Sequence, residues 1–412
     1  MSSRQSGVLL HPTSLPGPYG IGEIGPQATA FADALQSMGQ GVWQVLPLGP
    51  TSYGDSPYQS LSTFAGNPLL TSFDLLEADG LLSRSRLSRF PAWDPHRVDY
   101  GEVIPARTAV LDTVCRSFAR RASDDIKARY DAFCVENEAW LEDYALFVAL
   151  KNEHGGRPWT QWDPDLAARD PSAIRRASRT LRTAVRNARI RQFLFFDQWR
   201  RLATQCHERG VRLMGDLPIF VAHDSADVWA HRDLFHLDGA GFPTVVAGVP
   251  PDYFSATGQR WGNPLYNWTV HEQTDFAWWA ERMRCTFDMV DIVRIDHFRG
   301  FEAYWEIPAD EPTAIRGRWV EGPGAPFFEA LYRKLGDLPI IAEDLGLITA
   351  PVEALRDRFG FPGMQVLQFS FGPDGPLQDS HPERLRSNCV CYTGTHDNDT
   401  TRGWFWSDHG QN

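Results

Sequence analysis

The chain has 412 residues, of which 42% are hydrophobic and 22% charged, and its formal net charge is −12. This composition is typical of a globular protein, and the length fits one large barrel with insertions or two to three ordinary domains. The acidic balance argues against nucleic-acid binding. No run could span a membrane, the N-terminus lacks a signal-peptide core, and the six cysteines form no C-x-x-C pair. We therefore expect a cytoplasmic protein with neither a disulfide framework nor a zinc site.

Seven short apolar runs predict strands, at 7–10, 42–47, 211–216, 289–295, 338–343, 364–369 and 389–394. Helical spacing of apolar residues predicts helices between them, at 28–38, 193–207, 275–289, 327–335 and 352–358. This alternation predicts an α/β fold with a parallel sheet. We expect a (β/α)8 barrel, because several strands end in a carboxylate and strand ends converge at one mouth in that fold. The alternative is an open doubly wound sheet, although no G-x-G-x-x-G turn is present.

Two long segments interrupt the alternation of strands and helices. Residues 75–190 are rich in arginine and predict a helical insertion, and we interpret the basic residues as a solvated face. Residues 217–270 predict a loop-rich insertion that acts as a lid, because loops of this length in compact domains are usually functional. The remaining chain divides into 1–74, with the first two strands and a ligand-contacting loop, and 191–412, with strands three to seven.

The strand that leads to Asp296 is the centre of the predicted site. Because side chains alternate along a strand, Ile292, Arg294 and Asp296 share one face, while Val293 and Ile295 face a helical layer. An arginine two residues before Asp296 favours its ionised form. A charged carboxylate at the mouth of a barrel could act as a nucleophile, and it could equally be half of a structural ion pair.

Acidic residues recur at the predicted strand ends, as Asp216, Asp296, Glu343 and Asp397, the last beside His396. Most enzymes that cleave glycosidic bonds use two carboxyl groups, one on each side of the bond. Carboxylate clusters also bind Mg²⁺ or Ca²⁺, but Arg294 already supplies positive charge and aromatic residues crowd the loops. We therefore expect no metal ion and no other cofactor.

Seven motifs in one order carry a family resemblance: LHPTSLPGPYG at 10–20, YGDSPYQS at 53–60, GDLPIF at 215–220, PPDYFS at 250–255, RIDHFRG at 294–300, AEDLG at 342–346 and GTHDNDT at 394–400. Together they resemble amylomaltase, the 4-α-glucanotransferase family related to the α-amylases. The resemblance runs from residue 7 to the end of the chain. It implies a barrel enzyme that transfers α-1,4-glucan segments between maltodextrins, and we expect a monomer.

The resemblance also implies roles for individual residues. The Asp of R-I-D is the nucleophile in such enzymes, which implies Asp296, and the acid/base is the Glu of the fifth strand, Glu343. The Asp of T-H-D, here Asp397, binds sugar hydroxyls next to the reacting carbon. Substrate contacts are further implied for Tyr53, Tyr58, Asp216, Asp252, Tyr253, Phe254, Trp261, Arg294 and His396.

The implied mechanism is a retaining double displacement, in which the two carboxyl groups lie about 5–5.5 Å apart. Glu343 must hold a proton near neutral pH while Asp296 does not, and Arg294 is expected to keep Asp296 ionised. Two alternatives remain open from the residues alone. One is an α-amylase-like hydrolase that uses water as the acceptor, and the other is a catalytically inactive glucan-binding scaffold.

The end of the sequence generates a further expectation. The seventh predicted strand ends at Gly394, and 18 residues do not provide the roughly thirty that one more strand–helix unit needs. Because members of the resembled family continue with an eighth strand, we expect these residues to be a fragment or a truncated form. The open barrel edges would then favour aggregation.

Overall fold

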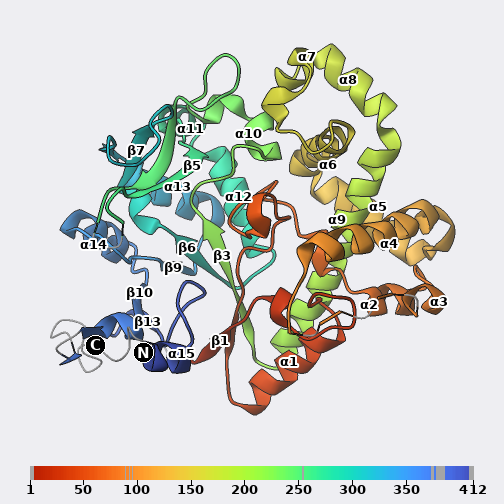
Figure 1. Cartoon of the computed structure of the whole chain (residues 1–412), viewed down its shortest axis with the longest axis horizontal. Coiled ribbons are helices and arrows are strands. Elements are labelled where there is room, and N and C mark those ends of the chain that lie inside the picture. The colour runs from red at the N-terminus through yellow and green to blue at the C-terminus, as the bar shows by residue number, and fades with distance from the viewer. Residues whose placement is uncertain are drawn as a thin grey trace.

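The computed structural model describes residues 4–88, 90–91, 93–94, 96–252, 255–372, 375–376 and 386–407. Its parallel strands are β1 (Gly7–Leu9), β2 (Val42–Gln44), β3 (Arg212–Pro218), β6 (Ile292–Asp296), β9 (Ile340–Ala342), β10 (Gly363–Val366) and β13 (Cys389–Tyr392) (Figure 1). All seven predicted strands are therefore confirmed, with ends that shift by a few residues.

The parallel strands curve around a shared interior. Five form one sheet in the order β1-β2-β3-β6-β9, and β10 pairs with β13. The N–H of Ala342 donates to the carbonyl of Pro362 at 2.9 Å and so joins β9 to the start of β10. Every one of the seven strands contributes to a single apolar cluster, whose members include Leu9, Val42, Met214, Ile292, Ile341, Met364, Val390 and Tyr392. This shared layer is consistent with the interior of the predicted barrel-type α/β fold, while the ladders of the described residues form a five-stranded sheet and a separate pair of strands.

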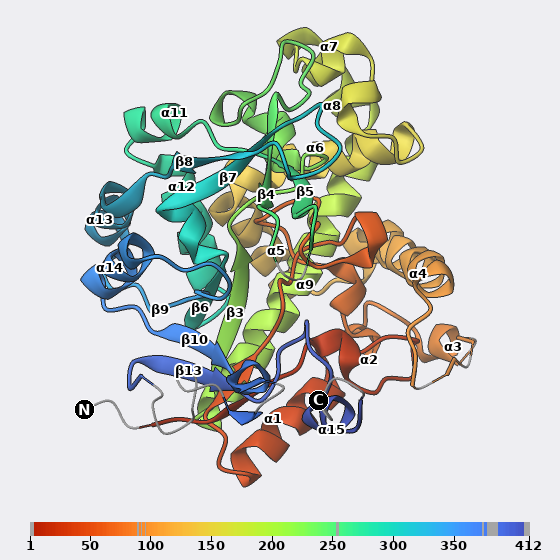
Figure 2. The same ribbon diagram turned by 60° about the vertical axis from the view of Figure 1, so that its left-hand side comes forward.

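The outer side of the strands is covered by α1 (Pro26–Ser37), α9 (Arg182–Glu208), α12 (Ala277–Phe287), α13 (Gly324–Leu335) and α14 (Ala350–Arg358) (Figure 2). The predicted alternation along β6 is confirmed. Ile292 belongs to the barrel interior, whereas Val293 and Ile295 belong to the core that includes these helices. The site residue Arg294 therefore faces the inside of the barrel.

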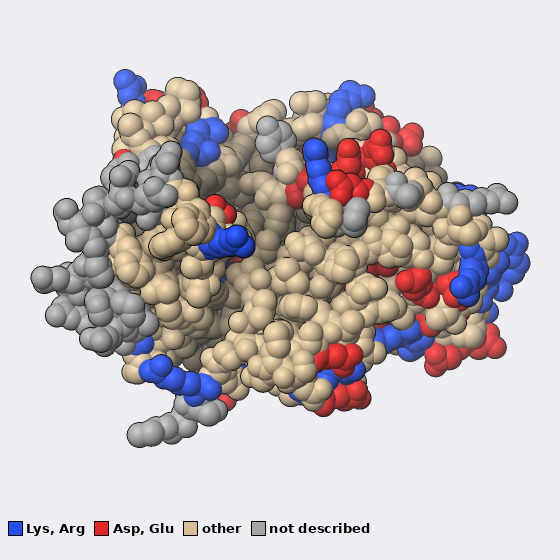
Figure 3. Space-filling model, turned by 60° about the horizontal axis from the view of Figure 1, so that its bottom comes forward, with Lys and Arg blue, Asp and Glu red and all other residues tan. Residues whose placement is uncertain are grey.

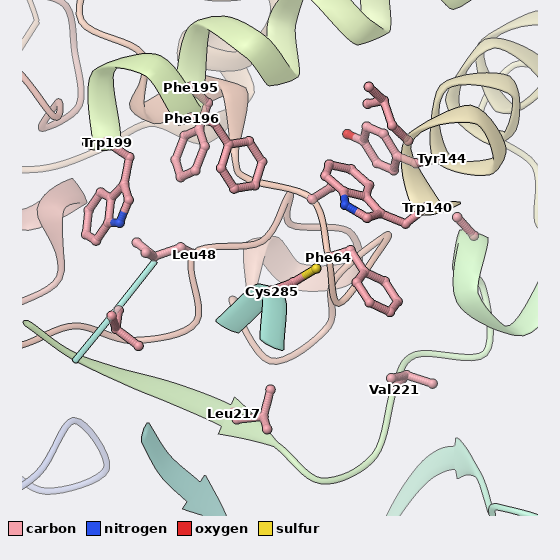
Figure 4. Close-up of a cluster of buried hydrophobic side chains, with 14 of the residues drawn as sticks. Leu48, Phe64, Trp140, Tyr144, Phe195, Phe196, Trp199, Leu217, Val221 and Cys285 are labelled. Carbon is pink, nitrogen blue, oxygen red and sulfur yellow. The ribbon is translucent and has the colours of Figure 1, made fainter. Parts of the chain in front are cut away.

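A helical region precedes α9 in the chain and lies to one side of the barrel (Figure 1). Its helices are α2 (Phe73–Ala78), α3 (Arg84–Leu87), α4 (Tyr100–Arg121), α5 (Asp124–Glu136), α6 (Glu138–Glu153), α7 (Pro164–Ala167) and α8 (Pro171–Thr180). Figure 4 shows how α9 joins this region to the barrel, with labelled side chains at Leu48, Phe64, Trp140, Tyr144, Phe195, Phe196, Trp199, Leu217, Val221 and Cys285. Trp199 on α9 donates its indole N–H to the carbonyl of Met289 at 2.8 Å, directly before β6.

The arginines at the end of this region and at the start of α9 fall into two groups, some paired with a carboxylate and others exposed to solvent. Arg169, Arg189 and Arg191 each pair with a carboxylate. The exposed arginines between them are Arg175, Arg176, Arg179, Arg182 and Arg186. Charges of both signs are interspersed on the described part of the face in Figure 3. No described helix combines the length and the apolar character that a membrane crossing requires.

A second, antiparallel sheet was not predicted. Its strands, in sheet order, are β5 (Gln259–Pro264), β4 (Val245–Val249), β7 (Ala303–Pro308) and β8 (Arg318–Glu321). Residues 217–270 thus contain strands, together with α10 (Ala226–Ala230) and the start of α11 (Trp268–Gln273). Glycine, proline and charged residues in these strands obscure the alternation that would have marked them. The remaining elements are β11 (Phe371–Gly372), β12 (Gly375–Pro376) and α15 (Thr401–Trp406).

The buried ion pair between Arg107 and Glu23 ties α4 to the loop before α1. Arg107 Nη1 lies 2.7 Å from Glu23 Oε1, Arg107 Nη2 donates to the carbonyl of Thr71 at 2.6 Å, and both side chains are almost completely buried. We predict that Arg107→Ala lowers the free energy of unfolding by about 3–5 kcal/mol, because an unpaired carboxylate remains inside. The matched control, Arg209→Ala, breaks an exposed pair with Asp33 and should cost about 0–1 kcal/mol.

The loss in Arg107→Ala should also depend on pH. Burial raises the pKa of Glu23, and Arg107 opposes that shift. Without Arg107 the folded state keeps a proton that the unfolded state releases near its ordinary pKa of about 4.3. Stability is therefore lost as the pH rises from the unfolded-state pKa through the folded-state pKa, and urea unfolding should show a smaller loss at pH ~4 than at pH ~8. Equal losses in the Arg107 and Arg209 variants would contradict the assignment.

Candidate active site

One guanidinium joins two carboxylates at the mouth of the barrel. Strands β3 and β6 are adjacent, and their register places Asp216 opposite Arg294. Arg294 Nη1 donates to Asp216 Oδ1 at 2.7 Å and to Oδ2 at 2.9 Å, and it lies 3.0 Å from Asp296 Oδ1. Arg294 and Asp216 are buried, whereas 32% of the Asp296 side chain remains exposed. Asp296 is thus the member of this cluster that a ligand can reach.

Residues from the first and last thirds of the chain complete this side of the site. Tyr58 donates its hydroxyl to Asp216 Oδ2 at 2.6 Å, and its ring stacks on His396 with centroids 5.2 Å apart. His396 Nε2 lies 3.3 Å from Asp397 Oδ1, and 76% of the Asp397 side chain is exposed. The stacked rings form a flat wall, and Asp397 adds a solvent-facing acceptor beside it.

Glu343 lies next to Asp296 because β9 is the neighbour of β6. The backbone N–H of Glu343 donates to the carbonyl of Ile295 at 3.0 Å and continues the ladder past the end of β9. Both side-chain oxygens accept backbone hydrogen bonds, Oε2 from the N–H of His297 at 2.7 Å and Oε1 from the N–H of Leu345 at 2.8 Å. The carboxyl group is therefore fixed by the backbone of two different loops.

An open pocket of about 390 Å³ lies above these groups. It is lined by Tyr58, Gln59, Pro218, Ile219, Phe220, Trp261, Asn263, Asp296, His297, His396 and Asp397. Trp261, on β5, contacts the ring of His297 edge to face, with centroids 4.8 Å apart. A carboxylate at the base, with aromatic rings around it, suits a sugar that presents both hydroxyl groups and apolar ring faces. Within the described residues, no group of three or more His, Cys, Asp or Glu side chains is arranged to bind a metal ion.

The model for the 4-alpha-glucanotransferase family, glycoside hydrolase family 77, matches residues 10–412. The chain belongs to this family. Curated 4-alpha-glucanotransferases from Thermus thermophilus and Synechocystis sp. are 53% and 49% identical to it, over 98% of this chain and 80% and 81% of their own lengths. The motif resemblance is thereby confirmed.

Solved structures agree with this assignment. An amylomaltase from Streptococcus agalactiae in complex with acarbose is 41% identical, with a TM-score of 0.94 over 98% of this chain and 81% of that chain. The amylomaltase from Corynebacterium glutamicum, at 19% identity, shares the fold with a TM-score of 0.80 over 98% of this chain and 56% of that chain. The chain is thus a glucanotransferase in fold and in family.

The structure brings together most of the residues that the sequence of this glucanotransferase predicted for its site. The predicted residues that line the pocket or contact its lining residues are Tyr58, Asp216, Trp261, Arg294, Asp296, His396 and Asp397, and Glu343 joins them through His297. Asp252 does not line the pocket; it is exposed, and its Oδ1 accepts a hydrogen bond from the N–H of Ser255. Tyr253 and Phe254 lie outside the described residues, as does the side chain of Tyr53.

The lining residues that the sequence analysis missed are Gln59, Pro218, Ile219, Phe220, Asn263 and His297. All of them except Asn263 fall inside the quoted motifs, so the motifs contained the signal. Asn263 follows Trp261 on β5, a strand that was not recognised. Its amide donates to the carbonyl of Val221 at 2.9 Å and so holds the rim of the pocket.

The ionisation of Asp296 differs from the expectation. Burial raises the pKa of Asp296 to about 7, Arg294 opposes the shift, and the carboxylates of Asp216 and Glu343 add to it. Burial also raises the pKa of Glu343, against Arg294 and the two backbone donors. We expected Arg294 to keep Asp296 ionised. Arg294 does lower the pKa of Asp296, but burial and the neighbouring carboxylates raise it by more. The guanidinium of Arg294 pairs with Asp216 as well as with Asp296. Its charge therefore does not fully offset the rise in the pKa of Asp296 that burial causes.

Replacement of Asp216 tests this electrostatic account. Asp216→Asn removes a carboxylate that raises the pKa of Asp296 and leaves Arg294 free to pair with Asp296 alone, so the pKa of Asp296 should fall. We predict that the acid limb of kcat/KM for maltotriose disproportionation moves to lower pH, by on the order of one unit. The control Asp33→Asn removes the same charge from an exposed position and should leave the limb in place. An unmoved limb in Asp216→Asn, or one at higher pH, would contradict the account.

Proposed function

We propose that this glucanotransferase transfers α-1,4-glucan segments by a retaining double displacement in which Asp296 is the nucleophile and Glu343 the acid/base. The observation that carries the proposal is the position of these two residues at the ends of adjacent strands, joined by the hydrogen bond from Glu343 N–H to the Ile295 carbonyl. Adjacent, registered strand ends suit the separation of about 5–5.5 Å that nucleophilic attack requires.

The first half of the reaction breaks the donor glucan. Glu343 gives its proton to the glycosidic oxygen while an Asp296 carboxylate oxygen attacks the anomeric carbon. The bond to the leaving glucan breaks with its electron pair on the protonated oxygen, and a glycosyl ester of Asp296 forms. In the second half, Glu343 takes the proton from the 4-hydroxyl of an acceptor glucan, whose oxygen attacks the same carbon and releases Asp296.

The charge distribution supports this division of roles. Arg294 lies 3.0 Å from Asp296 and stabilises negative charge there. Among the described residues, Arg294 forms an ion pair with Asp296 and none with Glu343, which favours Asp296 as the ionised nucleophile and Glu343 as the acid. The raised pKa of Glu343 matches an acid that must hold its proton until the donor binds.

The walls of the pocket provide the contacts for the sugar rings. The stacked pair of Tyr58 and His396 presents an aromatic face, and Asp397 presents solvent-facing acceptor oxygens to hydroxyl groups. The related amylomaltase that binds acarbose supports a saccharide ligand. Maltodextrins and other α-1,4-glucans are the proposed substrates, and a cytoplasmic monomer remains the expectation from the sequence.

The nucleophile is tested by Asp296→Asn. An amide cannot form the glycosyl ester, so we predict that maltotriose disproportionation falls by several orders of magnitude while the thermal unfolding transition is retained. Glu343→Gln should also be nearly inactive, because it removes both the proton donor and the base. Near-normal turnover in Asp296→Asn, with deamidation excluded by mass spectrometry, would refute the assignment.

The lid is tested by Trp261→Ala. Trp261 covers the pocket beside His297, so its removal opens a path for water to the glycosyl–enzyme and takes away a stacking surface. We predict a lower ratio of transfer to hydrolysis and a higher KM for maltotriose, measured from product chain lengths and reducing ends. Phe242→Ala is the matched control, since Phe242 is an exposed aromatic residue of the same insertion that does not line the pocket. An unchanged ratio in Trp261→Ala would show that Trp261 serves packing only.

A further inference from the structure

The residue directly after Asp296 has an unusual backbone conformation. His297 adopts φ 56° and ψ 49°, in the left-handed region. Few residues with a Cβ atom occupy this region, although histidine, asparagine and aspartate do so more often than most, and the surrounding structure must hold the conformation. Backbone conformations of this kind are frequent at functional sites, where they fix the position of neighbouring groups.

The left-handed turn directs two backbone donors at one residue. The N–H of His297 donates to Glu343 Oε2 at 2.7 Å, and the N–H of Phe298 donates to the backbone carbonyl of Glu343 at 3.2 Å. Both donors belong to the loop of β6, whereas Glu343 follows β9. The turn therefore fixes the carboxyl group of one strand end from the loop of its neighbour.

The imidazole ring is packed in a way that holds the turn. It contacts Trp261 edge to face at 4.8 Å and Phe220 at 6.4 Å between ring centroids. Gly300 provides the space on its other side, because a Cβ atom there would lie 3.3 Å from His297 Cδ2 and 2.9 Å from Ile219 Cδ1. Trp261 belongs to the proposed lid, so the packing links the lid to the turn.

The imidazole ring of His297 is uncharged near neutral pH. Burial lowers the pKa of His297 to about 3, with Arg299 adding to the shift, so the ring is neutral near pH 7. Its Nε2 atom is buried and has no hydrogen-bond partner among the described residues. Replacement of His297 by an uncharged residue therefore changes the backbone and the packing without a change of charge at neutral pH.

We propose that His297 is a positioning residue for the acid/base, whose left-handed turn aims a backbone N–H at Glu343 and whose ring contact with Trp261 ties that aim to the lid. This inference rests on the role proposed for Glu343. A hydrogen bond from an N–H stabilises the carboxylate over the acid. The turn thus favours the form of Glu343 that accepts the proton of the acceptor glucan, and it opposes the effect of burial.

Three other charged groups act on Glu343. They are Arg294 and Asp296 from β6 and Asp344 at the end of its own strand. Asp344 is paired in turn with Arg356 and, at 3.2 Å, with Arg386. Variants at position 297 therefore alter the two backbone donors of the turn and leave the chemical identity of these charged groups unchanged.

The test compares variants that differ in their tolerance of the left-handed region. Asparagine and glycine adopt it readily, whereas a β-branched residue does not. His297→Val should lower kcat/KM for maltotriose about tenfold or more and move the alkaline limb of its pH profile up by on the order of one unit, because the pKa of Glu343 rises without the N–H bond. His297→Asn and His297→Gly should keep the limb at its wild-type position. Thermal unfolding checks the fold, and His297→Ala replaces the valine variant if that variant does not fold.

Two results would overturn the inference. One is a wild-type alkaline limb in every variant, and the other is an equal shift in all of them, which would assign the effect to the ring and not to the backbone turn. The Glu343→Gln variant distinguishes a failure of the role proposed for His297 from a failure of the proposed function. If Glu343→Gln retains activity, the acid/base role itself fails. If it is inactive and the limb does not respond to His297→Val, only the role of His297 fails.

Discussion

The site depends on one guanidinium shared between two carboxylates. Arg294 is buried, reaches Asp216 with two hydrogen bonds and Asp296 with one ion pair, and is held by the alternation and register of β6 and β3. Its charge makes it possible to place acidic groups together inside the barrel. It does not neutralise all of them, and the pKa values of Asp296 and Glu343 are both raised, chiefly by burial. The proposed mechanism needs a proton on Glu343 at the start of each cycle.

The remaining groups are positioned by parts of the chain that are far apart in sequence. Tyr58 follows β2, His396 follows β13, and the two rings stack because the curved sheet brings these strands to the same mouth. Trp261 arrives from the antiparallel sheet that borders the pocket. The barrel thus supplies the charged base of the pocket, and the inserted segments supply its aromatic walls.

Much of this arrangement could be predicted from the sequence, for physical reasons. Apolar β-branched runs identified the seven parallel strands, and the period of two assigned Arg294 and Asp296 to the inner face. The second sheet could not be predicted, because β5 contains glycine, proline and exposed polar residues in place of a clear alternation and β4 is a short apolar run in a loop-rich segment. The raised pKa of Asp296 was missed because it depends on the sum of burial and neighbouring carboxylates. The left-handed turn at His297 was missed because it depends on contacts with Trp261 and Phe220, which are distant from His297 in the sequence.

The covalent intermediate on Asp296 is the most direct test of the account. Glu343→Gln would be incubated with α-maltosyl fluoride, whose leaving group needs little help from an acid, and analysed by mass spectrometry of its peptides. Because the glutamine amide of this variant cannot deprotonate an acceptor, the glycosyl–enzyme should accumulate. The account predicts one added maltosyl group on the peptide that contains Asp296. Attachment to another residue, or release of fluoride with no adduct at any time point, would contradict it.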